Sequence, residues 1–555
     1  MKYIELFSGC GGLSLGLESL NADGVRMDLV MANELSPMPA NTFAFNILKE
    51  DIEDTGRKPS KVKWLSSNYP VSELSNRLSE NPLTYPQLNK AFDDSIGTAF
   101  SDIENAESLY KKLIVANVVQ LNELFDTKEN LLSEFFSLLG GVGSLDFISG
   151  GPPCQSFSMA GLRKKDDHKN KLPLEFANFV DKFKPKLVLL ENVTGILRAF
   201  QEEGKRYYAW VEVAKAFASI GYIPLCLHVN AKYAGAPQNR PRFIMIGVRF
   251  DIYAQLKPRL NPQEKKLFSS AENFYASTDK SVGILECHDV KNEFDLFKSS
   301  FLSHLVDYPE DKVQISVRQA IDDLRYFKDG IEANPYYSKD RRSDYVKDNE
   351  KTLTGCSDRP DVIYNQVYRN NKSLVQQRFR LYQVLKEINC RYPHVAREVR
   401  AALKSEVMTA IVLSNEAWKV LNKKRFLIDE SFSGEPIWKS GNELSKGEFE
   451  ELLKKWRTKK QTQKALDAEK PAGTALSIPD DICHYHQNEL RTLTVREMAR
   501  IQSFPDKFIF RSKITTGGQM RKFEVPQYTQ VGNAVPPVLG RALGLCLRDL
   551  LSKLS

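Results

Sequence analysis

Six short apolar runs, each bounded by turn residues, constrain the fold of this chain more than any other feature. Helical patterns lie between several of them, and near-continuous apolar strands that alternate with helices are typical of a parallel sheet covered on both faces. The sequence therefore predicts an α/β fold with a doubly wound, Rossmann-like sheet. In such folds ligands bind beyond the carboxyl ends of the strands, so the loops that follow these runs are candidates for a site. The runs are Tyr3–Phe7, Leu29–Ala32, Leu145–Ser149, Leu187–Leu190, Leu225–Val229 and Phe243–Val248.

Two stretches interrupt this rhythm and divide the chain. With 555 residues, the chain is longer than one compact hydrophobic core accommodates, so at least two domains are expected. A polar segment at about 50–112 reads as an insertion, and a long segment at 256–487 combines basic clusters with aromatic residues. We therefore expect a first domain at 1–255, a second at 256–487, and a segment at 488–555 that returns to the first.

Composition excludes several classes of protein. The eight cysteines contain no CxxC pair and the seven histidines form no cluster at ligand spacing, so neither a disulfide scaffold nor a metal centre is expected. No apolar run approaches the roughly 18 residues of a membrane span, and no signal peptide precedes the first strand, which predicts a cytoplasmic location. The formal net charge of +8 is compatible with a polyanionic partner, although charge alone is weak support.

The first apolar run leads into a glycine-rich turn, Glu5–Gly12, with the sequence ELFSGCGG. Glycines let the backbone approach a ligand closely, and the helix N-terminus that follows favours polar groups of a ligand. Such a turn is often only a packing feature. However, Glu34 follows the second apolar run, where an acidic residue is placed to hold a ribose diol. Together the turn and Glu34 indicate a site for a nucleotide-like cofactor.

The third run delivers a cysteine onto a rigid loop. Within Asp146–Ser158 (DFISGGPPCQSFS), paired glycines and prolines precede Cys154, at the strand end where α/β sheets carry their active sites. Most lone cysteines are inert small hydrophobes, but this position favours a nucleophile. The loop that follows carries basic residues that could close on phosphates: Arg163, Lys164, Lys165, Lys169 and Lys171.

Charged residues also adjoin two later runs. Glu191 follows four apolar residues, where a buried carboxylate is costly unless it is protonated or paired, and this marks it as a functional candidate. Gln238-Asn239-Arg240-Pro241-Arg242 precedes the sixth run, and two arginines two apart point to one side of an extended segment. They could reach a carboxylate and a base carbonyl together.

Two motifs close the chain. Thr494–Glu497 is a capping box that should open a helix, which Pro505 stops. Gln530–Pro537 (QVGNAVPP) is a rigid turn that could present backbone groups to a ligand.

In this order along the chain, the blocks resemble the motifs of the C5-cytosine DNA methyltransferase family. The glycine turn resembles its adenosylmethionine motif, and Pro153-Cys154-Gln155 and Glu191-Asn192-Val193 resemble its two catalytic motifs. One block is modest support, but six in order are strong support. The remaining three blocks resemble its QxRxR motif and its two C-terminal motifs: Gln238–Arg242, Arg491–Pro505 and Gln530–Pro537.

The resemblance covers about 1–48, 114–250 and 488–555, and in this family the long unmatched segment holds a smaller target-recognition domain. It implies roles for individual residues and no metal. The catalytic residues would be Cys154, Glu191, Arg240 and Arg242. S-adenosyl-L-methionine would contact Phe7, Ser8, Gly9, Cys10, Gly11, Gly12, Glu34, Asn117, Val118, Pro153, Asn533 and Val535. DNA would contact Gln155, Ser158, Arg163, Lys164, Lys165, Lys169 and Gln238.

Two positions depart from the family's pattern. The family usually has an Asp at the end of the third strand, where this chain has Asn117. An Asn can hydrogen-bond an adenine, but it is not an acceptor-only group. In the closing loop, where the family often has an Arg, Lys169 would contact phosphate as a point charge.

The resemblance also implies a mechanism. The cytosine is flipped out of the duplex, Cys154 attacks C6, and C5 accepts the methyl group before the thiol is expelled. Glu191 would hydrogen-bond N3, and Arg242 would hold O2 with support from Arg240. The expected partner is double-stranded DNA. The expected biology is a monomeric enzyme of the bacterial cytoplasm, associated with the nucleoid, with a cognate restriction endonuclease that acts separately.

Three alternatives follow from the same residues. A transfer-RNA cytosine-5 methyltransferase is the nearest, but its recognition region is compact, whereas more than 200 residues separate Arg242 from Arg491 here. A catalytically inactive DNA-binding homologue would have lost Cys154, Glu191 or Arg242, and all three are present. A nucleotide-binding oxidoreductase is rejected because no GxGxxG follows the first strand.

Overall fold

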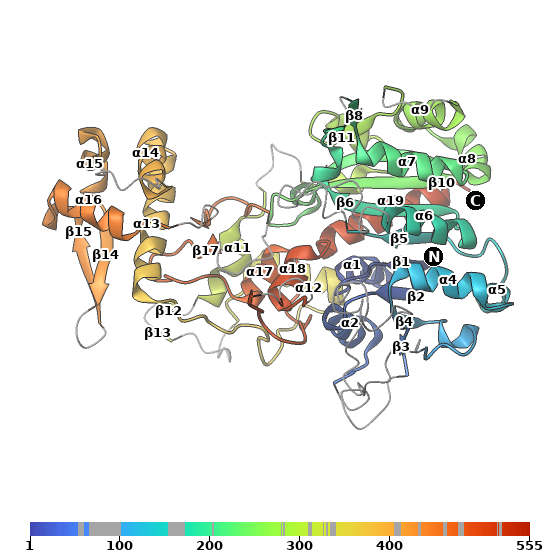
Figure 1. The fold of residues 1–555 in the computed structure, drawn as a ribbon, viewed down its shortest axis with the longest axis horizontal. Coiled ribbons are helices and arrows are strands. Elements are labelled where there is room, and N and C mark those ends of the chain that lie inside the picture. The colour runs from blue at the N-terminus through green and yellow to red at the C-terminus, as the bar shows by residue number, and fades with distance from the viewer. Residues whose placement is uncertain are drawn as a thin grey trace.

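Nine strands form the central sheet within the described part of the chain, in the order β11-β9-β10-β6-β5-β1-β2-β4-β3. The computed structural model describes residues 1–53, 60–65, 101–153, 172–202, 205–278, 280, 283–308, 314–325, 327–328, 331–332, 340–404, 412–430, 435–458, 463–474, 482–518, 520 and 524–554. The sheet strands are β1 (Lys2–Leu6), β2 (Asp28–Glu34), β3 (Val62–Trp64), β4 (Lys112–Val115), β5 (Phe147–Gly150), β6 (Leu187–Val193), β9 (Tyr222–Asn230), β10 (Pro241–Arg249) and β11 (Cys287–Asp289). Both chain ends lie beside this sheet (Figure 1).

The apolar runs form the middle of the sheet, as the sequence predicts. The first four side chains of β6 are completely buried, and so is every residue of β5. A strand that is covered on both faces has no solvated side, which explains why these runs show no polar alternation.

The sheet is not wholly parallel, and here the prediction is wrong in one strand. β10 pairs antiparallel with both β6 and β9, whereas the other pairs of the sheet are parallel. Ten residues, 231–240, connect β9 to β10, and they include the short η8 (Ala231–Ala234). A connection this short permits a hairpin but not the crossover that parallel strands require.

The chain reverses its direction of travel across the sheet at β1. It moves from β1 to β2 on one side, and β5 and β6 later add on the other side of β1. Because such crossovers are right-handed, α1 covers one face while α4, α5 and α6 cover the opposite face. The gap between the ends of β1 and β5 is therefore a topological switch point, where α/β folds bind ligands. The helices of this part are α1 (Gly12–Glu18), α2 (Pro37–Phe43), α4 (Val118–Thr127), α5 (Leu131–Leu139), α6 (Leu172–Phe183), α7 (Ala209–Ser219), α8 (Phe250–Leu256), α9 (Pro262–Ala276), α10 (Phe294–Lys298) and α19 (Pro537–Ser552).

The C-terminal helix α19 returns to the sheet and packs on α1 at backbone distance. A Cβ on Gly16 would lie 2.2 Å from the carbonyl oxygen of Pro537 and 2.5 Å from the amide nitrogen of Arg541. On the facing helix, a Cβ on Gly540 would lie 3.0 Å from the carbonyl oxygen of Leu13. Glycine is required at these positions because no side chain fits between the two helices.

The sheet domain extends past residue 255, the boundary that the sequence predicts. β11 joins the sheet beside β9, and Leu267, Phe274, Phe297 and Leu305 belong to the same buried core. The composition of the sequence changes near 255 because these later helices are more polar on their outer faces. Their buried faces still belong to the hydrophobic core of the sheet domain.

Two further cores follow along the length of the molecule. The second core combines α2 with α11 and the C-terminal helices α17 and α18. The third combines the helices α13 to α16 with the hairpin β14–β15. Figure 1 shows the third core at the end of the molecule away from the sheet, with α11, α12, α17 and α18 between them. Their helices are α11 (Val317–Ile321), α12 (Asp344–Thr354), α13 (Ser373–Asn389), α14 (Pro393–Lys404), α15 (Asn415–Leu421), α16 (Lys446–Lys455), α17 (Val495–Ile501) and α18 (Gln527–Asn533).

Small two-stranded pairs complete the fold. They are β7 (Phe200–Glu202) with β8 (Lys205–Tyr207), β12 (Phe327–Lys328) with β13 (Ile331–Glu332), β14 (Arg425–Glu430) with β15 (Pro436–Ser440), and β16 (Lys464–Ala465) with β17 (Ile482–Cys483). None of the helices in the described residues is long and apolar enough to span a bilayer.

The helix contact predicts a large stability difference between two glycine substitutions. Gly16→Ala places a methyl group against the backbone of α19, so the free energy of unfolding should fall by about 3 kcal/mol. Gly447 lies in α16, and a Cβ there meets nothing within 4 Å. Gly447→Ala should therefore stay within about 1 kcal/mol of the native protein. Urea unfolding of both variants measures the difference, and equal stabilities would contradict the close packing.

Candidate active site

The loop after β1 is shaped by residues with positive φ. Phe7, Gly9 and Gly11 have φ of 54°, 55° and 93°, which turns the chain sharply before α1 begins at Gly12. A Cβ on Gly9 would meet nothing within 4 Å, so the space above this residue is open. The hydroxyl of Ser8 is buried and has no hydrogen-bond partner within the described part of the chain. The loop thus offers an open backbone surface with an unused polar group.

The carboxylate of Glu34 closes this loop from the neighbouring strand. Its two oxygens accept hydrogen bonds from the backbone N–H groups of Gly9, at 2.9 Å, and Ser36, at 2.8 Å. Burial raises the pKa of Glu34, and the N–H groups that point at the carboxylate oppose this rise. Each carboxylate oxygen can accept a second hydrogen bond, so Glu34 keeps capacity for a ligand. The sequence prediction that joined Glu34 to the glycine turn thus describes two groups in direct contact.

The other residues of the glycine turn have packing roles. Cys10 is buried with its sulfur 3.8 Å from the carbonyl oxygen of Gln530, and burial raises the pKa of its thiol to about 12. A Cβ on Gly12 would lie 2.3 Å from the carbonyl oxygen of Val535. Cys10 and Gly12 therefore hold the turn against the C-terminal segment. The ring of Phe7 is half-buried, 6.4 Å from that of Phe176 in an edge-on arrangement.

At the end of β4, Asn117 is the N-cap of α4. Its side-chain oxygen accepts a hydrogen bond from the N–H of Val119, and both Asn117 and Val118 are buried. Nearby, the side-chain amide of Asn33 donates to the carbonyl oxygens of Ile114 and Ala116 and ties β2 to β4. No local sequence pattern marked Asn33, because a single Asn within a strand resembles any surface residue.

Glu191 and Arg242 form an ion pair at the carboxyl end of β6. Arg242 Nε lies 2.6 Å from Glu191 Oε1, and the two side chains are only 8% and 13% exposed. The pair forms across the antiparallel strands, where Ile244 faces Glu191 and Arg242 faces Val193. The paired guanidinium compensates the cost of burying the carboxylate, as the sequence prediction for Glu191 requires.

The ion pair lies against the loop that leads to Cys154. A Cβ on Gly151 would be 3.2 Å from Glu191 Oε2, and the side-chain amide of Asn192 donates to the carbonyl oxygen of Pro152 at 3.0 Å. Pro153 is exposed at the end of this described stretch. The remaining residues predicted on the loop lie outside the described residues: Cys154, Gln155, Ser158, Arg163, Lys164, Lys165 and Lys169.

The three polar residues of the QxRxR motif have different surroundings. Arg240 is 1% exposed and donates to the carbonyl oxygens of Gly532 and Ala534, at 2.8 and 2.9 Å. Gln238 is completely buried, and neither amide atom has a hydrogen-bond partner among the residues that the structure describes. In this conformation Gln238 has no surface to offer to DNA. Only Arg242 reaches the carboxylate of Glu191.

The backbone of this motif also binds the chain where it returns from the third core. The N–H of Ala472 donates to the carbonyl oxygen of Pro237 at 2.9 Å, and the N–H of Asn239 donates to that of Ala472 at 2.7 Å. These hydrogen bonds connect the sheet domain directly to the returning segment.

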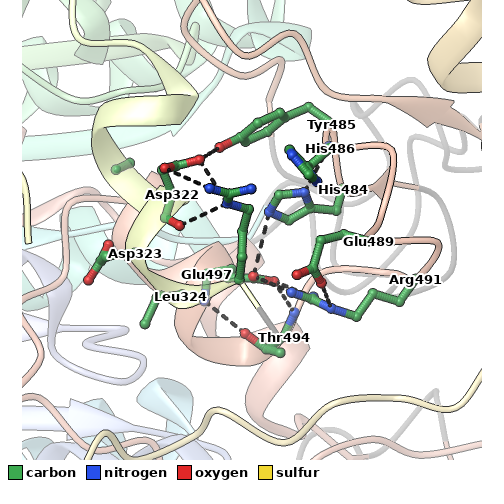
Figure 2. A network of polar contacts seen from close by, with 12 residues as sticks. Asp322, Asp323, Leu324, His484, Tyr485, His486, Glu489, Arg491, Thr494 and Glu497 are labelled. Carbon is green, nitrogen blue, oxygen red and sulfur yellow. Dashed lines mark hydrogen bonds and ion pairs between the residues drawn. The ribbon is translucent and has the colours of Figure 1, made fainter. Parts of the chain in front are cut away.

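A buried polar network fixes the next part of the chain (Figure 2). Arg491 donates two hydrogen bonds to the carboxylate of Glu497, of 2.8 and 2.7 Å, and another to Glu489. The capping box that the sequence predicts is confirmed, since Thr494 and Glu497 exchange both hydrogen bonds and α17 ends before Pro505. Burial and the charge of Arg491 hold the pKa of His484 well below its usual range, so this ring is neutral.

The last predicted element is the turn between α18 and α19. Asn533, the last residue of α18, is exposed just before this turn, while Gly532 and Ala534 on either side of it are buried. Val535 is half-buried behind it, and its carbonyl oxygen faces Gly12 of the first turn. The two turns that the resemblance assigns to the methyl donor, although separated by most of the chain, are therefore neighbours.

The fold and this arrangement at the switch point are those of a Rossmann-like methyltransferase. The sequence model of one family, the C-5 cytosine-specific DNA methylases, matches residues 1–67 and 139–547. The chain belongs to this family.

Curated relatives agree with this assignment. The chain is 27% identical to the Type II methyltransferase M.DdeI of Desulfomicrobium norvegicum over 405 residues, 72% of each protein. It is 26% identical to the Type II methyltransferase M.AgeI of Thalassovita gelatinovora, over 74% of this chain and 84% of that protein. It is 25% identical to the Type II methyltransferase M.Bpa9945I of Bacillus paralicheniformis, over 100% of this chain and 99% of that protein.

A buried acid beneath the glycine turn predicts a pH-dependent stability. Glu5 accepts a hydrogen bond from the hydroxyl of Ser14, and burial raises its pKa to about 8. The folded chain therefore holds a proton that the unfolded chain releases above about pH 4.5. This contribution to stability is complete below that pH and is lost as the pH rises through 8.

Glu5→Gln keeps the shape and removes the titration. The variant should be more stable than the native protein at pH 8.5, and the difference should shrink steadily as the pH is lowered to 6. Thermal unfolding across this pH range measures it. A difference that does not change with pH would show that Glu5 is ionised in the folded state.

Proposed function

We propose that this chain methylates C5 of cytosine in a specific short sequence of duplex DNA, with Cys154 as the nucleophile. The Glu191–Arg242 ion pair carries the proposal, because it lies at the carboxyl end of β6, the strand next to β5, and against the loop that leads to Cys154. A carboxyl group and a guanidinium side by side match the N3 and O2 atoms on the edge of cytosine. Membership of the C-5 cytosine-specific DNA methylase family supports the reaction.

The residues after β1 and β2 fit S-adenosyl-L-methionine. The open space above Gly9 admits a ligand close to the backbone, and the unpartnered hydroxyl of Ser8 offers it a hydrogen bond. Glu34 retains acceptor capacity for a ribose diol, and Asn533 is exposed at the end of α18. When bound, S-adenosyl-L-methionine would supply the methyl group of its sulfonium, and its sulfur would leave as a neutral thioether.

The chain's own residues activate the base. The thiolate of Cys154 attacks C6 and breaks the C5–C6 double bond, which makes C5 an enamine-like nucleophile. Glu191, protonated or sharing a proton with N3, donates a hydrogen bond to N3 and offsets the charge that develops on the ring, while Arg242 holds O2 and orients Glu191. C5 then gains the methyl group and loses its proton to a base. The electron pair left by that proton re-forms the double bond and expels the thiolate.

The region around the third core is the proposed target-recognition domain. It packs separately from the sheet and is joined to it by the backbone hydrogen bonds of Ala472 with Pro237 and Asn239. The basic loop after Cys154 would add phosphate contacts, which position the DNA without reading its sequence. The relatives named as type II methyltransferases lead us to propose a monomeric bacterial enzyme of a restriction-modification system, which acts in the cytoplasm on nucleoid DNA.

The nucleophile is tested in a host that lacks cytosine methylation. Bisulfite sequencing of the host DNA should show one short methylated motif with the native chain and none with Cys154→Ala. Cys390→Ala is the matched control, because that cysteine is exposed at the end of α13, and it should leave methylation unchanged. Methylation by the Cys154 variant would exclude the covalent route, and methylated RNA without methylated DNA would favour the transfer-RNA alternative.

The ion pair predicts a loss of catalysis without a loss of folding. Arg242→Gln removes the charge that holds Glu191, and kcat should fall by about 10²–10³, as for other preorganised electrostatic groups. Arg249 lies at the opposite end of the same strand and pairs with Asp251 on the surface. Arg249→Gln should leave kcat within about twofold, since exposed pairs contribute little. The kcat of both variants is measured on an unmethylated duplex that carries the target motif. A similar loss of kcat in both variants would contradict the assignment.

A further inference from the structure

The turn that presents Asn533 is held by two buried side chains from distant parts of the chain. Arg240 Nη2 donates to the carbonyl oxygens of Gly532 and Ala534, at 2.8 and 2.9 Å. Gln502, at the end of α17, donates from Nε2 to the carbonyl oxygen of Val531 at 3.0 Å. Three carbonyl groups in four consecutive residues are thus held by side chains.

The burial of both hydrogen-bond donors, Arg240 and Gln502, costs free energy of folding. Arg240 is 1% exposed, and its Nε and Nη1 atoms have no hydrogen-bond partner among the described residues. Burial and the neighbouring Arg242 lower its pKa well below the usual range. Gln502 is completely buried, and its side-chain oxygen also has no partner there. Side chains chosen for stability alone would not bury unpaired polar atoms, so these donors point to a functional requirement.

The rest of the turn is held as firmly. The hydroxyl of Ser503 accepts a hydrogen bond from the N–H of Val538 at the start of α19, at 3.3 Å. On the other side, the carbonyl oxygen of Val535 faces Gly12 with no room for a side chain. Asn533 is the exposed residue between these fixed points. The backbone at Asn533 is therefore held on both sides, while its side chain is exposed.

Arg240 and Arg242 divide two tasks between neighbouring positions. Arg242 contacts Glu191 at the proposed base pocket, whereas Arg240 contacts the turn at the proposed donor pocket. A segment of three residues therefore joins the two pockets through hydrogen-bonded backbone and side chains.

We propose that Arg240 and Gln502 are positioning residues for the methyl donor, which hold the backbone of residues 531–534 so that Asn533 faces S-adenosyl-L-methionine. Arg240 then acts on donor binding and does not touch the cytosine. This inference rests on the proposed function, and it reassigns Arg240 from the base to the donor.

The test compares donor binding with turnover. Gln502→Met removes the hydrogen bond to Val531 and keeps a side chain of similar volume. Arg240→Met removes the two hydrogen bonds to Gly532 and Ala534. Calorimetry with S-adenosyl-L-methionine in the absence of DNA should show a Kd about tenfold higher for Gln502→Met and higher still for Arg240→Met. Arg240→Lys keeps a side-chain group that can donate a hydrogen bond to the turn, and it should recover part of the affinity for S-adenosyl-L-methionine. At saturating donor, kcat and the KM for DNA should stay within about twofold for Gln502→Met.

Two controls separate positioning from general stability. Gln383 in α13 is as buried as Gln502 and donates to the carbonyl oxygens of His484 and His486, away from the turn. Gln383→Met should leave the Kd for the donor unchanged. Arg242→Gln should lower kcat and leave the Kd for S-adenosyl-L-methionine unchanged. This is the opposite of the result expected for Gln502→Met, which should raise that Kd and leave kcat unchanged.

Each outcome decides the inference. An unchanged Kd for S-adenosyl-L-methionine in both Gln502→Met and Arg240→Lys overturns the inference. A rise of this Kd in Gln383→Met that equals the rise in Gln502→Met also overturns it. If Arg240→Met does not fold, Gln502→Met decides alone. A native protein that binds no S-adenosyl-L-methionine refutes the proposed function itself, whereas a native protein that binds it and methylates cytosine leaves only the positioning roles in question.

Discussion

Helix α19 lies on helix α1 at backbone distance, and the site depends on this contact. The absence of side chains at Gly16 and Gly540 lets the two backbones meet, with no space for a methyl group at the closest point. The same approach brings the carbonyl oxygen of Val535 against Gly12. Because α19 starts directly after the turn that carries Asn533, docking the helix also docks the turn. The two parts of the proposed methyl-donor site come from opposite ends of the chain, and they meet because α1 and α19 have no side chains at Gly16 and Gly540, where their backbones approach.

The reversed direction of β10 is a second constraint, and it determines which groups meet the carboxylate. The parallel strands end at one edge of the sheet, and an antiparallel strand begins at that same edge. Arg242, near the start of β10, therefore faces the end of β6 and reaches Glu191. A parallel strand of this length would place Arg242 at the opposite edge, about 25 Å away at about 3.3 Å per residue. The ion pair is thus a consequence of the short connection between β9 and β10, which leaves room for a hairpin alone.

Local pattern was enough to predict the strands and several contacts of the site. A strand buried on both faces must be apolar throughout, so β5 and β6 are visible as continuous runs in the sequence. A carboxylate at the end of such a run needs a partner, and this requirement marks Glu191 as a functional candidate. The capping box at Thr494 was readable because its two groups lie three residues apart. In each case the physical requirement acts within one element, where the sequence records it directly.

The remaining contacts depend on partners that no local pattern reveals. Arg240 and the carbonyl oxygen of Gly532 are 292 positions apart, and a backbone carbonyl leaves no trace in the sequence. The spacing of the QxRxR motif suggested that both arginines serve one target, but Arg240 lies just before β10 while Arg242 lies within it. The alternation of side chains along a strand therefore does not apply to this pair. A motif that is compact in sequence spans a boundary between structural elements, and that boundary gives its residues separate tasks.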